Sequence, residues 1–300
     1  MTIGKILAGV AVFCAISTGA AAMPLCPDGQ RSYFGFCPSG QETSVPSNQP
    51  PPASAPPVAA PPTSGPTTYD LDEAFVLLRQ HRYAGALPLI KKAAEHGNAH
   101  AQGILGRMYI NGEEGVPKND ALALSWARKS AEQGDVDGEN VYADLLTMGN
   151  LYTKAKNIPP PNPAEGFVWW QKAAAQGSPR AEVAVGDAYY FGLVVPRNIE
   201  EAIRWYGRAI KQNYGPAFST LGKLLEDGAG DELPKNVALA ANAYQQGADL
   251  EDGRCEWYLA LLYDRGEGVA KAHAKAIALI KKAAQDGDYH AQDWLKAYPQ

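Results

Sequence analysis

The stretch that decides the fold runs from Gly97 to Gly134 and reads GNAHAQGILGRMYINGEEGVPKNDALALSWARKSAEQG. Within it, a proline, a basic residue and an asparagine stand together at residues 117–119. The same element returns at residues 196–198 and 234–236, and a Pro-Asn-Pro variant stands at residues 161–163. Copies that recur roughly every 40 residues are typical of repeat proteins built from helix pairs.

A second block precedes each of these elements. In four copies a small residue stands five positions before a glycine or an alanine: Ala101–Gly106, Ala181–Gly186, Ala217–Gly222 and Cys255–Ala260. Small side chains at matched positions let two helix backbones approach closely. Each repeat is therefore predicted to be two short helices joined by a glycine-rich loop, such as residues 111–115, and Cys255 is predicted to be a buried packing thiol.

The ends of the predicted helices carry their own signals. The asparagine after each proline is expected to cap the second helix, because its side-chain oxygen can accept a bond from a free backbone N–H. The residues that close the second helices in a left-handed conformation are Gly97, Gly134, Gly177 and Gly287, with Asn213 once in that place and Glu251 as a departure. The tryptophans seven residues after the asparagines, Trp126, Trp169 and Trp205, are expected to fill the space between successive pairs.

This unit resembles the Sel1-like repeat, a relative of the tetratricopeptide repeat with a longer loop between its helices. Residues 101–134 match the family pattern almost throughout, and residues 181–213, 217–250 and 255–287 match it progressively less well. Residues 138–177 keep the second helix, lose the glycine and tyrosine of the first, and carry an insertion at residues 158–161. The resemblance implies an all-α fold, a right-handed α-solenoid of about five to six stacked helix-turn-helix pairs.

The residues before the repeats divide into three segments. Residues 1–22 have a lysine, an apolar run and a final Ala-Ala-Ala, which predicts a secretory signal peptide. The run is short for a membrane span, so no span is expected after cleavage, although an uncleaved anchor is an alternative. Residues 23–45 form a short loop with two Cys-Pro-x-Gly-Gln copies, and we expect a disulfide between Cys26 and Cys37 in an oxidising compartment. That loop either presents its aromatic residues to a partner or is a tag without a role of its own.

Residues 46–68 are rich in proline, which favours a disordered, semi-rigid linker. Their P-x-x-P strings would also fit peptide ligands of reader domains. The repeat solenoid is predicted to span residues 69–300, with an atypical helix pair at its beginning and a lone helix at its end.

The sequence offers no recognisable catalytic chemistry. It contains no G-x-S-x-G, Walker, dinucleotide-binding or H-E-x-x-H motif. His96 and His100 have a spacing that suits two metal ligands on one helix, but Gly97 ends the helix between them. We therefore predict no catalytic residue, no cofactor and no metal. The net charge of −5 and the hydrophobic content of 46% suit a globular protein and offer no basic surface for nucleic acid.

In tetratricopeptide-like solenoids the first helix of each pair lines a concave groove, and the resemblance implies the same arrangement here. The exposed positions beside the recurrent glycine mix charges with aromatic residues, as peptide-binding surfaces often do. The candidate groove residues are His100, Arg107, Asn111, Arg180, Asp187, Tyr190, Lys223, Glu226, Arg254, Trp257 and Asp264.

These expectations favour a non-enzymatic bacterial protein, periplasmic or secreted, that binds a protein partner in this groove. It would act as a scaffold or regulator in the cell envelope, or as a secreted effector. The alternatives are a module that binds cell-wall glycan or peptidoglycan through the groove aromatics, and an enzyme that acts on the cell wall.

Overall fold

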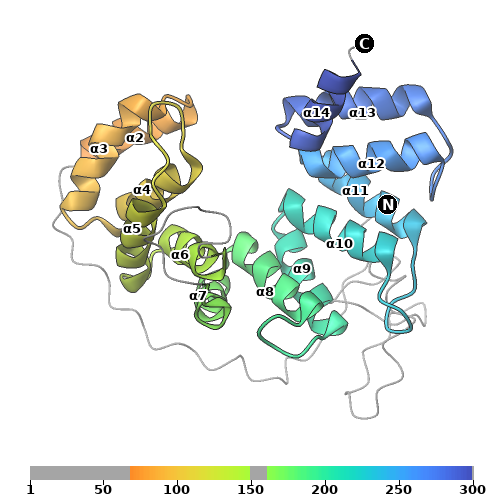
Figure 1. The fold of residues 1–300 in the computed structure, drawn as a ribbon, viewed down its shortest axis with the longest axis horizontal. Coiled ribbons are helices and arrows are strands. Elements are labelled where there is room, and N and C mark those ends of the chain that lie inside the picture. The colour runs from red at the N-terminus through yellow and green to blue at the C-terminus, as the bar shows by residue number, and fades with distance from the viewer. Residues whose placement is uncertain (1–67, 149–160, 299–300) are drawn as a thin grey trace. The chain divides into compact units, whose positions relative to one another are not determined.

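The computed structural model describes residues 68–148 and 161–298, and regular structure in these ranges is helical apart from one isolated bridge between Ala229 and Asp231. The predictions for residues 1–67, including the Cys26–Cys37 disulfide, lie outside the described residues and stay predictions. The thirteen helices of the described ranges are α2 Thr68–Arg79, α3 Tyr83–Glu95, α4 Ala99–Asn111, α5 Asp120–Glu132, α6 Val136–Met148, α7 Pro163–Ala175, α8 Pro179–Phe191, α9 Ile199–Lys211, α10 Gly215–Asp227, α11 Val237–Ala248, α12 Gly253–Arg265, α13 His273–Gln285 and α14 Tyr289–Ala297 (Figure 1).

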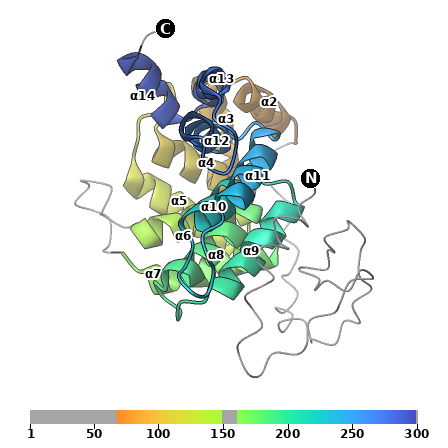
Figure 2. The same ribbon diagram turned by 90° about the vertical axis from the view of Figure 1, so that its right-hand side faces the viewer.

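The helices follow one another as pairs, from α2 with α3 to α12 with α13, and α14 is single. Contacts join neighbours in the chain and also the first helices of adjacent pairs, such as α4 with α6 and α10 with α12 (Figures 1 and 2). The prediction of an all-α chain of stacked helix pairs is confirmed. The described residues form two compact units: residues 68–148, 161–188 and 193–195 in one, and residues 189–192 and 196–298 in the other. We call them the N-terminal and the C-terminal unit.

The predicted asparagine caps are present on four second helices. The side-chain oxygens of Asn119, Asn162, Asn198 and Asn236 accept from the backbone N–H three residues further on, at 3.0, 3.3, 3.0 and 3.0 Å. The same cap residue also fixes the loop, because its own N–H donates to a carbonyl near the end of the first helix. The donor and acceptor pairs are Asn119 to Tyr109, Asn162 to Leu146, Asn198 to Tyr189, Asn236 to Leu225 and Ala272 to Tyr263.

The left-handed residues lie where the sequence predicts them. The backbone φ is 90° at Gly97, 80° at Gly134, 87° at Gly177 and 91° at Gly287, and it is 57° at Asn213. At Glu251 φ is 61°, so this repeat keeps the left-handed turn although its residue carries a side chain that disfavours it.

The predicted packing of the small residues is correct, while that of the tryptophans is only partly so. The side chains of Ala101, Ala181, Ala217 and Cys255 are fully buried. The side chains of Trp126, Trp169 and Trp205 are only half-buried. A cation lies over each ring. The distance to the ring centroid is 4.4 Å from Lys129 Nζ to Trp126, 3.5 Å from Lys172 Nζ to Trp169 and 4.3 Å from Arg208 Cζ to Trp205. In the C-terminal unit the residue one position later fills the core instead, since Tyr206 and Tyr244 are fully buried.

Candidate functional site

The candidate residues lie at recurrent positions of the first helices, which are counted here from the residue that caps each helix. These cap residues are Asn98, Asp135, Ser178, Tyr214, Asp252 and Asp288. All except Tyr214 accept the backbone N–H three residues further on. They directly follow the left-handed residue. A sequence signal of glycine followed by asparagine, aspartate or serine would have located four of them, but not Tyr214 or Asp252.

Position 9 of one first helix contacts position 2 of the next in the N-terminal unit. Arg107 at position 9 of α4 donates to Asp137 Oδ1 at position 2 of α6, at 3.3 Å. Asp144 at position 9 of α6 forms an ion pair with Arg180 at position 2 of α8. The charge order is reversed between the two pairs, but the same two positions meet. Such a contact ties one repeat to the next on the exposed side of the first helices.

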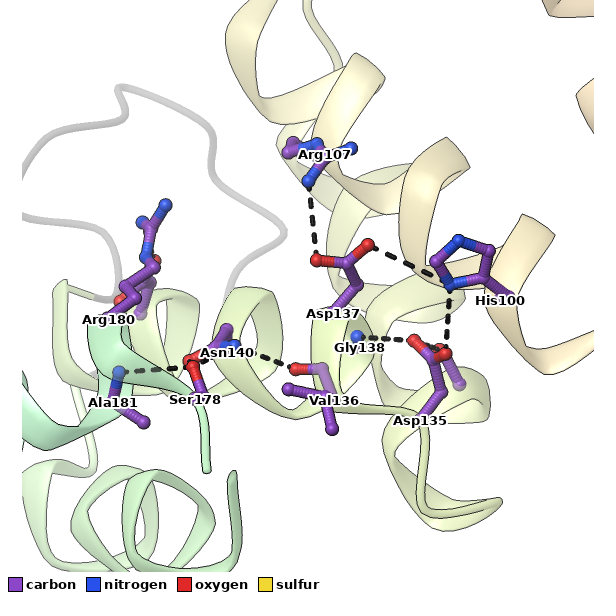
Figure 3. Close-up of polar contacts among 12 residues, drawn as sticks. His100, Arg107, Asp135, Val136, Asp137, Gly138, Asn140, Ser178, Arg180 and Ala181 are labelled. Atoms are coloured by element: carbon purple, nitrogen blue, oxygen red, sulfur yellow. Dashed lines mark hydrogen bonds and ion pairs between the residues drawn. The ribbon is translucent and has the colours of Figure 1, made fainter. Parts of the chain in front are cut away.

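His100 joins the first of these pairs. Its Nδ1 lies 3.1 Å from Asp135 Oδ2 and 3.8 Å from Asp137 Oδ2 (Figure 3). The hydrogen bond to Asp135 raises the pKa of His100 above its ordinary value, while burial acts against it. Burial alone would raise the pKa of Asp135, but hydrogen bonds from His100, from the Gly138 N–H and from Ser130 lower it. The cluster therefore favours a positive His100 beside a negative Asp135.

This cluster contains a serine, an aspartate and a histidine, but not in the arrangement of a hydrolase. Ser130 Oγ lies 2.7 Å from the Ala99 carbonyl oxygen and 3.0 Å from Asp135 Oδ1. The aspartate thus lies between the serine and the histidine, whereas nucleophilic catalysis needs the histidine next to the hydroxyl. Ser130 instead packs against Gly138, where any Cβ would lie 2.1 Å from its Oγ. Its role is to close the contact between two repeats.

The second pair is anchored more deeply. Asp144 also accepts from Trp170 Nε1 at 3.3 Å, and its side chain is only 13% exposed against 55% for Arg180. Burial raises the pKa of Asp144 above its ordinary value, although Arg180 and Trp170 act against this. The exposed guanidinium of Arg180 is therefore held in place by the nearly buried carboxylate of Asp144.

In the C-terminal unit several candidate residues also serve to join helices. Glu226 accepts from Tyr244 at 2.9 Å and from Arg265 at 3.0 Å, so it connects α10, α11 and α12. Lys223 pairs with Asp227 on its own helix at 2.7 Å, and Asp264 lies 2.7 Å from His273 of α13. Of these three candidate residues, Glu226 is largely inaccessible, while Lys223 and Asp264 are exposed.

Arg254 differs from the other charged candidates. It is exposed at position 2 of α12, and none of the described residues forms an ion pair or a hydrogen bond with its side chain. Trp257 lies one turn further along α12 and stacks on His290 of α14, with ring centroids 5.9 Å apart and an angle of 14°. Tyr289 is 60% exposed, and the centroid of its ring lies 3.8 Å from that of His290. This region therefore combines a free cation with an accessible aromatic surface.

The remaining candidates make local contacts. Asn111 is exposed and donates to Glu113 at 2.8 Å, Tyr190 lies against Phe191, and Asp187 is half-buried. The structure thus connects His100 with Arg107 through Asp137, and it does not join the eleven candidates into one site. Sequence reasoning missed Asp135, Asp137, Asp144 and Arg265, which carry most of the contacts.

Two further features concern cofactors and membranes. Within the described ranges no group of three or more His, Cys, Asp or Glu side chains is placed to hold a metal ion. No helix in the same ranges is both long and apolar enough to cross a membrane. Cys255 is a free thiol there, and burial raises its pKa far above the ordinary value, which keeps it unreactive.

Solved structures with the same architecture include several bacterial proteins. A Sel1 repeat protein from Oxalobacter formigenes is 27% identical, with a TM-score of 0.58 over 76% of this chain and 89% of the other. The immunity protein Pa5087 from Pseudomonas aeruginosa is 18% identical, with a TM-score of 0.53 over 71% and 82%. The immunity protein PA5088 from the same organism is 19% identical, with a TM-score of 0.52 over 77% and 92%. The last two likenesses concern the fold alone.

A search of the curated proteins found no match. The model of the Sel1 repeat matches residues 99–135, 148–178, 179–214, 221–252 and 253–288, which together make up more than half of the chain. Four of the matches include residues from both helices of a pair, whereas the match at residues 148–178 covers α7 and leaves out all but the last residue of α6, the helix that has lost the sequence markers. The chain belongs to the Sel1 repeat family.

Proposed function

We propose that this protein is a non-enzymatic scaffold that binds a protein partner through the exposed side of its first helices. Sel1 repeat proteins are generally protein-interaction scaffolds. The observation that carries the proposal for this chain is the fixed row of charged side chains at positions 2 and 9. Their side chains are held in place by neighbouring repeats but remain 43–55% exposed at His100, Arg107 and Arg180. Charges that are fixed before binding lose little conformational entropy when a partner binds.

The proposal includes export to the cell envelope or beyond, because residues 1–22 have the composition of a secretory signal peptide. Cell fractionation of the producing bacterium tests this directly. We expect the protein in the periplasm or the medium, with its N-terminus at Met23 and with Cys26 and Cys37 oxidised. A cytoplasmic protein that retains residues 1–22 would contradict this part of the proposal.

The binding face can be tested by site-specific photo-crosslinking in envelope extract. A photoreactive residue replaces Asn111 or Arg254 on first helices, and matched replacements stand at Leu122 and Val168, which are 40% and 48% exposed on second helices. We expect one protein to be captured at first-helix positions alone, and the same protein, once purified, to bind the unmodified chain. Capture of that protein at second-helix positions alone would assign binding to the opposite face.

A second candidate function is the binding of cell-wall glycan, and the exposed rings of Trp257, His290 and Tyr289 favour it, because sugars stack on aromatic surfaces. Sedimentation with purified peptidoglycan separates the two functions. A protein that cosediments, and loses this property in Trp257→Ala, would favour the glycan.

A further inference from the structure

We infer that Lys223 and Arg254 in the C-terminal unit form a binding site for a carboxylate that an acidic peptide segment of the partner supplies. This inference rests on the proposed function and names the partner chemistry at one place of the same face. Lys223 occupies position 9 of α10, and Arg254 occupies position 2 of α12. These are the two positions that meet as Arg107 with Asp137 and as Asp144 with Arg180 in the N-terminal unit.

In the N-terminal unit each meeting of positions 9 and 2 brings one cation to one aspartate. In the C-terminal unit the equivalent positions both carry cations. First helices α10 and α12 are in contact, and Tyr258, one turn after Arg254, is close enough to Lys223 to influence its pKa. The two cations therefore occupy the positions that meet in the N-terminal unit, without the aspartate that Arg107 and Arg180 have there. A carboxylate from outside the chain can serve both of them, as an aspartate serves Arg180.

The charges nearby do not neutralise this region. Asp227 pairs with Lys223 at 2.7 Å, but both side chains are 47% exposed, and a solvated pair four residues apart on one helix is easily exchanged. Glu226 is engaged by Tyr244 and Arg265 and is only 12% exposed. Arg254 has no acidic partner among the described residues.

The surroundings favour a peptide rather than a bare anion. Trp257 presents a half-buried ring one turn from Arg254, stacked on His290 and continued by the exposed Tyr289. A peptide with an apolar or aromatic side chain next to its acidic residue would place the carboxylate on the cations and the apolar group on these rings. In the N-terminal unit the cations at the equivalent positions, Arg107 and Arg180, also bind aspartate side chains.

Binding to defined peptides tests the inference on the full chain. The probes are labelled peptides in which glutamate or aspartate stands beside leucine or phenylalanine, each with a twin that carries glutamine or asparagine. We expect the acidic member of at least one pair to bind more tightly, with an affinity that falls as salt rises. Arg254→Gln should weaken binding of the acidic peptide roughly 10- to 100-fold, while Lys281→Gln, which removes an exposed cation from second helix α13, should not.

A second variant tests the geometry without any ligand. Lys223→Asp should recreate the Asp144–Arg180 pair, so that it occupies Arg254, abolishes binding of the acidic peptides and leaves the thermal midpoint unchanged or higher. If Lys223→Asp and Arg254→Gln have additive effects on the thermal midpoint, the two positions do not meet and the inference is wrong.

The outcomes separate this inference from the proposed function. If the crosslinked native partner still binds Arg254→Gln with full affinity, the scaffold proposal stands and the carboxylate site is refuted. Equal binding of acidic peptides and their amide twins would also refute it. If an acidic oligosaccharide binds through Arg254 and Lys223 while no acidic peptide does, the site holds a carboxylate but the partner is a glycan, which contradicts the inference as stated.

Discussion

Glu139, a buried acid in the N-terminal unit, has a pKa near neutral pH. Glu139 of α6 is 3% exposed and accepts a bond from Gln176 at the end of α7, at 2.9 Å. Burial raises its pKa to about 7, while Lys172 and the bond from Gln176 act against this and Asp135 adds to it. Position 4 of α4 carries a polar side chain as well, since Gln102 donates to the Ala94 carbonyl oxygen at 3.0 Å. The position thus joins first helices to the ends of second helices in both of these repeats.

Stability should therefore fall as the pH rises from about 5 to about 8. The folded protein holds the proton of Glu139 up to about pH 7, whereas the unfolded chain releases it near the ordinary value of 4.5, so the folded state loses its advantage across this window. We expect the free energy of unfolding of Glu139→Gln to equal that of the wild type near pH 5 and to be higher by roughly 1–3 kcal/mol at pH 8, measured by urea unfolding.

Glu114→Gln is the matched control, since it removes the same charge from an exposed loop. It should leave the wild-type difference between the two pH values in place. A wild-type stability that does not fall between pH 5 and pH 8, or an identical fall in Glu139→Gln, would show that Glu139 does not carry the effect.

At the scale of the helix, α13 lacks the asparagine cap that the second helices α5, α7, α9 and α11 have. Ala272 begins α13 with φ −151° and ψ 79°, close to the values of −151° and 92° at Asn119 before α5. Its backbone N–H makes the same loop bond as its equivalents, to the Tyr263 carbonyl oxygen at 2.9 Å. The local geometry for a cap is therefore present, and only the side-chain oxygen is missing.

Ala272→Asn should restore the cap and raise the free energy of unfolding by about 1 kcal/mol. Ala272→Gln is the control, because its amide lies one bond further from the backbone and caps poorly. The reciprocal change Asn236→Ala should lower stability by a similar amount. Chemical denaturation of the three variants measures this, and equal midpoints for Ala272→Asn and Ala272→Gln would show that α13 does not use the cap.

At the scale of the whole chain, the fold could be predicted from the sequence because the markers of each repeat are local. A cap, a left-handed residue and a small residue each act within one helical turn or one helix contact. They can therefore be recognised in the sequence without knowing which residues of the next repeat they contact. The pairs between first helices are different, since they depend on residues in two repeats at once. Asp137 and Asp144 carry them from α6, the helix whose glycine and tyrosine markers are absent, and therefore sequence reasoning placed Arg107 and Arg180 but not their partners.

Stability in a chain of repeats is expected to be local, because each helix pair contacts mainly its neighbours. Gly222 of α10 offers a sharp probe of this. A Cβ at this residue would lie 2.3 Å from Cε1 of Tyr244, whose ring is fully buried and whose hydroxyl is held by Glu226 at 2.9 Å. The ring has no free direction in which to move, so the extra methyl group must displace the backbone of α10 or α11.

Gly222→Ala should therefore destabilise the protein by roughly 1–3 kcal/mol. Gly85→Ala makes the same substitution in α3, where the nearest atom would be Leu77 Cδ1 at 3.5 Å, and it should stabilise by about 0.5–1 kcal/mol through helix propensity. Hydrogen exchange measured by mass spectrometry locates each effect. Gly222→Ala should lose protection mainly within residues 196–298, and Gly85→Ala should gain it mainly in α2–α4. A uniform change over residues 68–148 and 196–298 in either variant would show that the chain unfolds as one cooperative body, and nearest-neighbour stacking would then not describe its stability.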